Sequence, residues 1–188
     1  WRGIRESIQA RIDSLDPAMP DHTAQRDFHR AQLIVIDANI DLYKRYARLA
    51  GELAERAAEP RRTELLRIAA NCGWVAENPP RTVWETLQLG FLIANSVLIE
   101  SNGHSVSFGR FDQAIHPFYQ RDIGNGAATP EFVQELIESV MIKFCGYLKL
   151  RDWRTTQHNN GRCLGGLTVT IGGVDAEGGD ASNELTYM

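Results

Sequence analysis

The feature that most constrains the fold is one apolar stripe that runs through residues 24–57. Apolar side chains recur there at alternating steps of three and four, which is the spacing of one face of a helix. The stripe consists of Leu33, Ile36, Ile40, Tyr43, Ala47, Ala50 and Ala54. Charged residues fall on the opposite side, which we interpret as a solvated face. We therefore expect one long helix that packs within its own chain, with a helical interaction module that binds a partner helix as the alternative.

Prolines and caps mark where further helices start. Pro60 separates the long helix from a second one at 61–71, and Asn78-Pro79-Pro80 breaks the chain again. The next helix, from Thr82, is apolar on nearly every side, so we expect it to be buried all round. Thr129-Pro130-Glu131 predicts another helix start, with the threonine as cap and the proline in the first turn. Its expected buried face is Val133, Leu136, Val140, Phe144 and Leu148.

The end of the chain has a different residue composition. Residues 167–171 are β-branched and short, which is typical of a strand. Glycine pairs follow, and Asp180 is a plausible N-cap for a last helix over 181–188. We interpret the stretch from Asp175 to Asp180 as a glycine turn, because it lacks the closing glutamate of a calcium loop. Strands separated by helices favour an α/β barrel or sheet.

A dense polar segment, residues 101–113, follows an apolar run and precedes an aromatic-rich one. Residues 86–99 are too apolar for a solvated helix, so this segment starts near a core. Asn102-Gly103 tolerates a sharp backbone turn there. We therefore expect the hydroxyls and the imidazole of residues 101–113 to line an enclosed space, and we call these residues the pocket segment.

Polar and apolar residues then alternate along the pocket segment, as in a short strand with one face exposed to solvent. Ser105 and Ser107 share one side of it, and Val106 and Phe108 share the other. His104 beside Ser105 is the best candidate for polar contact with a ligand, because imidazole exchanges protons near neutral pH. A standalone serine–histidine hydrolase is disfavoured, because adjacent strand residues point to opposite faces and no Gly-x-Ser-x-Gly elbow or orienting acid is present.

Several stretches in one order resemble glycyl radical enzymes of the pyruvate formate-lyase-like group, and together they span most of the chain. They are Arg26-Asp27-Phe28, Asn78-Pro79-Pro80-Arg81-Thr82-Val83-Trp84-Glu85, the pocket segment from Asn102 to Gln113, Pro117-Phe118-Tyr119, Thr170-Ile171-Gly172-Gly173 and Asp180-Ala181-Ser182-Asn183-Glu184-Leu185. The resemblance implies an α/β fold, in which this chain is a helix-rich fragment of a ten-stranded α/β barrel of the glycyl radical enzyme type.

On this resemblance, residues 1–188 are a partial pyruvate formate-lyase-like domain. Its expected parts are a helical layer at 1–100, the pocket segment at 101–113, helices at 114–150, a loop and strand at 151–179 and a truncated helix at 180–188. The radical-cysteine loop, which resembles Gly-Cys-Val-Glu, and the glycyl radical domain have no counterpart in these residues. Cys72, Cys145 and Cys163 lie outside such a context, so no catalytic residue is assigned and the fragment alone is expected to be inactive.

The resemblance also implies the chemistry of the whole protein. A radical-SAM activating enzyme installs a glycyl radical on the parent, no cofactor is bound otherwise, and the parent is a cytoplasmic homodimer of anaerobic metabolism. Pyruvate formate-lyase proper has small apolar residues where this chain has His104 and Ser105, so we expect these two to bind substrate. A dehydratase or eliminase that cleaves C–O, C–C or C–N bonds of a small polar substrate is favoured, and formate C-acetyltransferase is the alternative.

Composition excludes other classes of protein. The net charge of −4 and the absence of a basic cluster argue against nucleic acid binding. The apolar run near Leu87 to Ile99 is too short and too polar for a membrane span. Three cysteines without metal-type spacing favour a reducing compartment. His22, His29 and His116 show no ligand spacing, so no metal site is predicted. His158 lies in a polar loop, which we expect at the surface or behind the pocket.

Overall fold

The computed structural model describes residues 1–101, 106–147, 152–158 and 168–188. These residues form two compact units, Trp1–Pro80 and Arg81–Met188. The helices of the first are α1 (Arg2–Asp13), α2 (His22–Arg56) and α3 (Arg61–Val75). The elements of the second are α4 (Val83–Glu100), β1 (Ser107–Arg110), α5 (Phe111–Gly124), α6 (Pro130–Cys145), α7 (Trp153–His158), β2 (Thr168–Thr170) and the 3-10 turn η1 (Glu184–Thr186).

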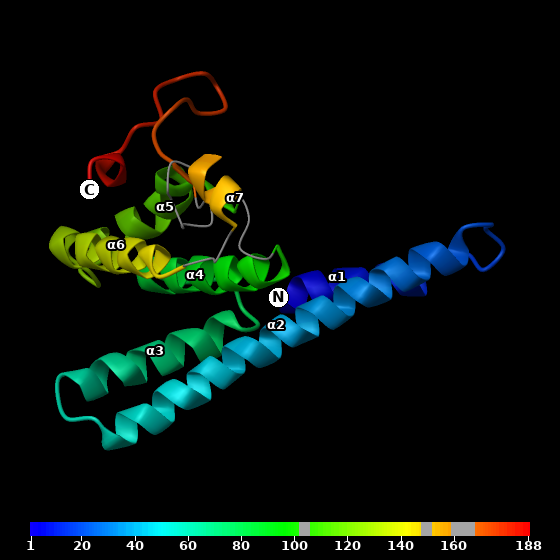
Figure 1. Cartoon of the computed structure of the whole chain (residues 1–188), viewed down its shortest axis with the longest axis horizontal. Helices are drawn as coiled ribbons and strands as arrows, with labels where there is room; N and C mark the ends of the chain where they lie inside the picture. The colour runs from blue at the N-terminus through cyan, green and yellow to red at the C-terminus, as the bar shows by residue number, and fades with distance from the viewer. Residues whose placement is uncertain (102–105, 148–151, 159–167) are drawn as a thin grey trace. The chain divides into compact units, whose positions relative to one another are not determined.

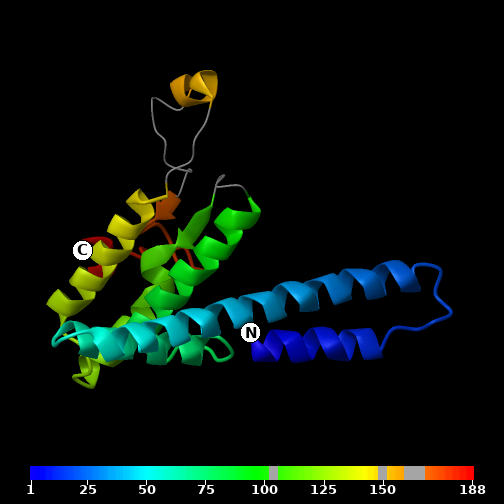
Figure 2. The same ribbon diagram turned by 60° about the horizontal axis from the view of Figure 1, so that its bottom comes forward.

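The first unit is built on the long helix α2. α1 lies along its N-terminal half and α3 along its C-terminal half (Figures 1 and 2). Ile36, Tyr43, Ala50 and Ala54 of the predicted stripe are buried. Small alanines let α3 approach closely, and a Cβ on Gly73 would lie 3.9 Å from the Cβ of Ala47. The long intramolecular helix is confirmed, and the stripe that supported an interaction module is occupied within its own chain.

The second unit packs α5 and α6 against α4 (Figure 1). Its core consists of Val83, Leu87, Phe111, Ile115, Tyr119, Val133, Ile137 and Leu185. The predicted start of α6 is confirmed, because the Thr129 side chain accepts a hydrogen bond from the Phe132 N–H at 3.3 Å. The expectation that the helix after Thr82 is buried all round is wrong for the described chain. Ile93, Val97 and Ile99 are exposed, since α5 and α6 cover one side of α4 only.

The strands form one parallel pair, β1 with β2, in the part of the chain that the structure describes. The long helix predicted over 181–188 is replaced by the single turn η1. Asn183, and not Asp180, is its cap, because the Asn183 side chain accepts from the Leu185 N–H while Thr186 Oγ1 accepts from the Asn183 N–H. No helix among the described residues is long and apolar enough to cross a membrane.

A buried carboxylate holds the start of α4. Asp122, on α5, is 4% exposed, and its Oδ2 accepts a hydrogen bond of 2.7 Å from the Val83 N–H. The first N–H groups of a helix have no partner within the helix, so Asp122 supplies one from a distant segment. The same contact fixes α5 against α4. It thereby positions β1, which lies between these two helices in the sequence.

We predict that Asp122→Ala exposes the Val83 amide to exchange. A lost hydrogen bond to a buried charge costs about 1–3 kcal/mol, which corresponds to roughly tenfold to hundredfold faster exchange. Hydrogen exchange at Val83, followed by NMR, measures it. Asp122→Asn is the matched control, because its side chain still offers an acceptor oxygen, and equal exchange rates in all three proteins would contradict this assignment.

Candidate functional site

The described part of the pocket segment is Ser101 and residues 106–113. His104 and Ser105, the predicted substrate contacts, lie outside the described residues, so their role stays a prediction. What the structure does describe is the frame that carries them: β1, the first turn of α5 and the segments bound to both.

The two faces of β1 differ as the alternation predicts. Phe108 is half-buried, and its ring centroid lies 4.6 Å from that of Phe144 on α6. Ser107, its neighbour, is exposed. The Thr168 N–H donates to the Val106 carbonyl at 3.0 Å, and because the pair is parallel, β1 and β2 begin at the same end of the sheet. One face of β1 is therefore apolar and aromatic, and the other is polar and exposed.

Asp112 is the most constrained polar residue of this frame. Its side chain is fully buried at the start of α5. Oδ1 accepts from the Gln113 N–H at 2.8 Å, and Oδ2 accepts from the Gly172 N–H at 2.7 Å and from the Thr186 hydroxyl at 2.5 Å. A buried carboxylate is tolerated only with such partners, because removing it from water without them costs several kcal/mol.

Two neighbours of Asp112 hold the same turn. The Gln113 side-chain amide donates to the Gly172 carbonyl at 2.7 Å, and the Arg110 guanidinium donates to the Val174 carbonyl at 2.9 Å. We call Arg110, Asp112 and Gln113, together with the turn 172–174, the turn clasp. Its side chains bond to backbone groups and to the Thr186 hydroxyl, so the turn clasp organises the site rather than reacting in it.

Glycine is required within the turn clasp at position 172. Its φ is +63°, a left-handed conformation that side chains rarely adopt. A Cβ there would lie 3.3 Å from Ser182 Oγ and 3.6 Å from Thr186 Cγ2. The Gly172-Gly173 pair that carried part of the family resemblance is therefore a conformational requirement of this site.

Ionisation of Asp112 is favoured in the folded chain. Burial by itself raises the pKa of a carboxyl, but the hydrogen bonds from Thr186, Gly172 and Gln113 act in the opposite direction, and the net pKa of Asp112 is lowered. The turn clasp is therefore built around a carboxylate anion at neutral pH.

The sign of this shift predicts a pH dependence. A lowered folded-state pKa gives stability that is present above the unfolded-state value, about 4, and is lost as pH falls through the folded-state value. The difference in unfolding free energy between the parent chain and Asp112→Asn, measured by urea unfolding, should shrink between pH 7 and pH 3. A difference that stays constant with pH would contradict an ionised Asp112.

The remaining predicted candidates do not gather into a site. His116, which shows no metal-ligand spacing in the sequence, has its Nε2 3.0 Å from Glu184 Oε2, and this contact links α5 to η1. No group of three or more potential metal ligands occurs among the residues that the structure describes.

α7 ends at His158, where the sequence predicted a loop. Asp175 accepts from the Gly179 N–H at 2.7 Å, so the predicted glycine turn is confirmed.

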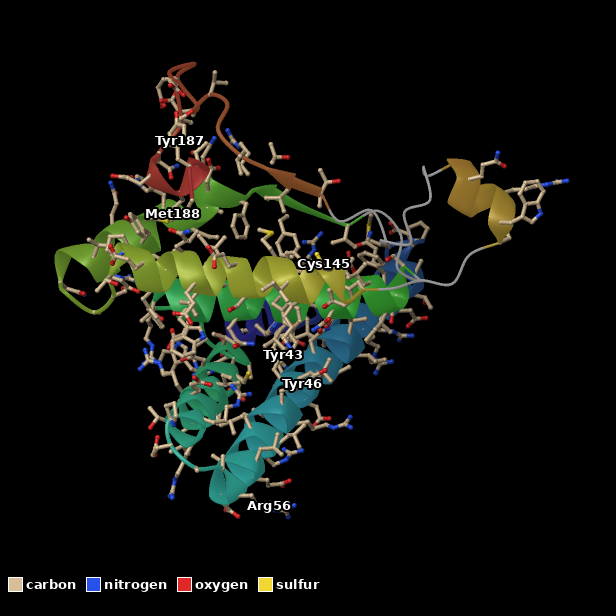
Figure 3. The ribbon with its side chains drawn as sticks, turned by 60° about the vertical axis from the view of Figure 1, so that its left-hand side comes forward. Tyr43, Tyr46, Arg56, Cys145, Tyr187 and Met188 are labelled. Atoms are coloured by element: carbon tan, nitrogen blue, oxygen red, sulfur yellow. The ribbon has the colours of Figure 1, made fainter. Side chains whose placement is uncertain are left out.

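The buried cysteine Cys72 does not resemble a radical or nucleophilic thiol, whereas Cys145 is exposed. Cys72 is 1% exposed, and burial raises the pKa of its thiol to about 11. Cys145 is exposed near the end of α6 (Figure 3). Cys163 lies outside the described residues. A reactive cysteine needs an accessible thiolate, and Cys72 offers neither access nor a thiolate at neutral pH.

This contrast predicts selective alkylation. With iodoacetamide at pH 8, Cys145 should be modified in the folded chain while Cys72 stays unmodified, because a thiol with a pKa of about 11 is about one-thousandth ionised there. Peptide mass spectrometry resolves the two positions, and unfolding in urea should make both react. Early modification of Cys72 in the folded chain would contradict its burial.

Comparison with known proteins agrees with this geometry. The chain is 41% identical over its whole length to (2S)-3-sulfopropanediol dehydratase of Klebsiella oxytoca and 39% identical to isethionate sulfite-lyase of Nitratidesulfovibrio vulgaris. It spans 23% of the length of each, about a quarter of these relatives. Among solved structures, glycerol dehydratase of Clostridium butyricum superposes on 99% of this chain and 23% of its own, with a TM-score of 0.92 and 33% identity.

The fold is that of glycyl radical enzymes, as the sequence predicted. A glycyl radical enzyme from Archaeoglobus fulgidus matches 99% of the chain and 24% of its own length, with a TM-score of 0.91 and 34% identity. The family model described as "Pyruvate formate lyase-like" matches residues 1–188. The chain belongs to the pyruvate formate lyase-like family.

Proposed function

We propose that this chain is part of a glycyl radical enzyme that cleaves a C–O, C–C or C–N bond of a small polar substrate, in the manner of a dehydratase or eliminase. The observation that carries the proposal is the whole-chain similarity to a sulfopropanediol dehydratase and an isethionate sulfite-lyase. The polar pair His104 and Ser105 supports the same choice, because the family resemblance implies small apolar residues at these positions in pyruvate formate-lyase proper.

The chain's own contribution is to hold substrate. The radical group of the whole enzyme supplies hydrogen abstraction, and none of the described cysteines fits that role. His104 and Ser105 would bind a substrate hydroxyl or a similarly polar group. An unpaired polar group in such a site costs about 1–3 kcal/mol, which is how a site of this kind discriminates against substrates that lack the hydroxyl.

Partners and setting follow from the same proposal. The complete protein would act as a homodimer in the cytoplasm of an anaerobic cell, after activation by a radical-SAM enzyme. Residues 101–113 keep their proposed role as the pocket segment. The 188-residue chain by itself would lack activity, because the thiyl cysteine and the radical glycine belong to other segments.

A substrate panel tests the proposal. The polypeptide encoded by the complete reading frame is activated anaerobically and offered (2S)-3-sulfopropanediol, isethionate, glycerol and 1,2-propanediol, and products are measured by mass spectrometry. We expect turnover of at least one of these. Turnover of pyruvate with coenzyme A, and of none of the panel, would instead identify the formate C-acetyltransferase alternative.

The substrate contact is tested by His104→Ala in the same protein. We expect kcat/KM for the panel substrate to fall roughly tenfold to hundredfold, as the loss of a buried hydrogen bond implies. His22→Ala, at the start of α2 in the first unit, is the matched control and should leave kcat/KM unchanged. Equal effects of the two substitutions would contradict a substrate role for His104.

A further inference from the structure

We infer that Asp112 and Thr186 are positioning residues for the substrate-binding segment: they lock the register of β1 against β2. The inference rests on the proposed function, since it names what holds that same site in place. Neither residue reacts or binds substrate in this account, and both act through the strand that follows His104 and Ser105.

The lock begins with Gly172, which is held from two sides. Its N–H donates to Asp112 Oδ2 at 2.7 Å, and its carbonyl accepts from the Gln113 amide at 2.7 Å. Both polar groups of this one residue are therefore bound by consecutive residues of α5. Because Gly172 lies two residues after β2, it cannot slide along the chain axis without breaking both bonds.

Thr186 closes the lock from a third segment. Its hydroxyl donates to Asp112 Oδ2 at 2.5 Å and accepts from the Asn183 N–H at 2.9 Å. A hydroxyl has one proton, and here that proton is committed to Asp112. The capping box of η1 thus aims the hydroxyl at the carboxylate, and Leu185, beside it, is buried in the core.

A lock is needed because the strand pairing itself is irregular. Ser107 pairs with Thr168 and Arg110 with Thr170, so three steps along β1 match two along β2. Gly109 lies in this irregular stretch with a φ of +63°. A bulge of this kind accommodates one extra residue, and two short strands offer few ladder bonds to specify where it sits. The turn clasp supplies contacts that specify the register.

Register matters for substrate selection because side chains alternate along a strand. A slip of one residue exchanges the two faces of β1, so Phe108 would leave Phe144 and Ser107 would take its place. β1 belongs to the described part of the pocket segment, so the same slip would change the face that the proposed site offers to a substrate. Asp112 and Thr186 would therefore influence affinity for the substrate without touching it.

The test uses the complete activated protein and the panel substrate that it converts. Thr186→Val removes the hydroxyl while nearly keeping the shape of the side chain, and Thr186→Ser restores the hydroxyl. We expect Thr186→Val to raise KM about tenfold, equivalent to about 1.4 kcal/mol, with kcat within about threefold of the parent. Thr186→Ser should return KM to within about threefold of the parent value. Hydrogen exchange at the Gly172 and Thr168 amides should be faster in Thr186→Val.

The outcomes separate this inference from the proposed function. Faster exchange at Gly172 with an unchanged KM would overturn the inference, because the lock would then be structural only. An unchanged kcat/KM in His104→Ala as well would place the failure in the proposed function. Asp112→Asn gives a second route: it should raise KM in the parent protein and add little in Thr186→Val, whereas fully additive effects would contradict a shared lock.

Discussion

The second unit depends on the burial of one charge. The carboxylate of Asp112 is fully enclosed, and a charge in that position is stable only when hydrogen bonds replace the water it has lost. Those bonds come from the start of α5, from the turn after β2 and from η1. Gly172 and Thr186, which follow Asp112 by 60 and 74 residues in the chain, are thereby brought to the same carboxylate oxygen, Oδ2. The short parallel sheet, which would be marginal alone, gains its partners in this way.

Buried carboxylates also organise the other junction of this unit. Asp122 accepts from the Val83 N–H, and Glu85, 1% exposed, accepts from the Arg81 N–H at 2.6 Å. Each acid satisfies a backbone donor beside a helix start, where the helix itself provides none. The first unit uses a different principle for α3, because an apolar stripe and small alanines hold α3 on α2, while the exposed ion pair of Arg5 with Asp37 links α1 to α2. Among the described residues, the buried carboxylates Glu85, Asp112 and Asp122 all belong to the second unit, where the proposed site lies.

Local patterns predicted the parts of the fold that local physics determines. The stripe on α2 could be predicted because a helix places residues three and four apart on one face. The cap at Thr129 could be predicted because threonine before proline is typical of a helix start. The cap of the last turn was predicted at Asp180 and lies at Asn183, since both residues suit a cap and only tertiary contact with Asp112 through Thr186 selects between them. The role of Asp112 itself was missed, because its partners are distant in sequence. His104 and Ser105 were selected by family resemblance, which periodicity alone does not supply.

The most direct measurement is a crystal structure of the complete protein with a hydroxylated panel substrate bound. The account predicts a substrate hydroxyl within hydrogen-bond distance of His104 or Ser105, with Asp112 still bonded to the Gly172 N–H and the Thr186 hydroxyl. A substrate bound away from residues 101–113, or an Asp112 side chain turned toward solvent, would contradict it.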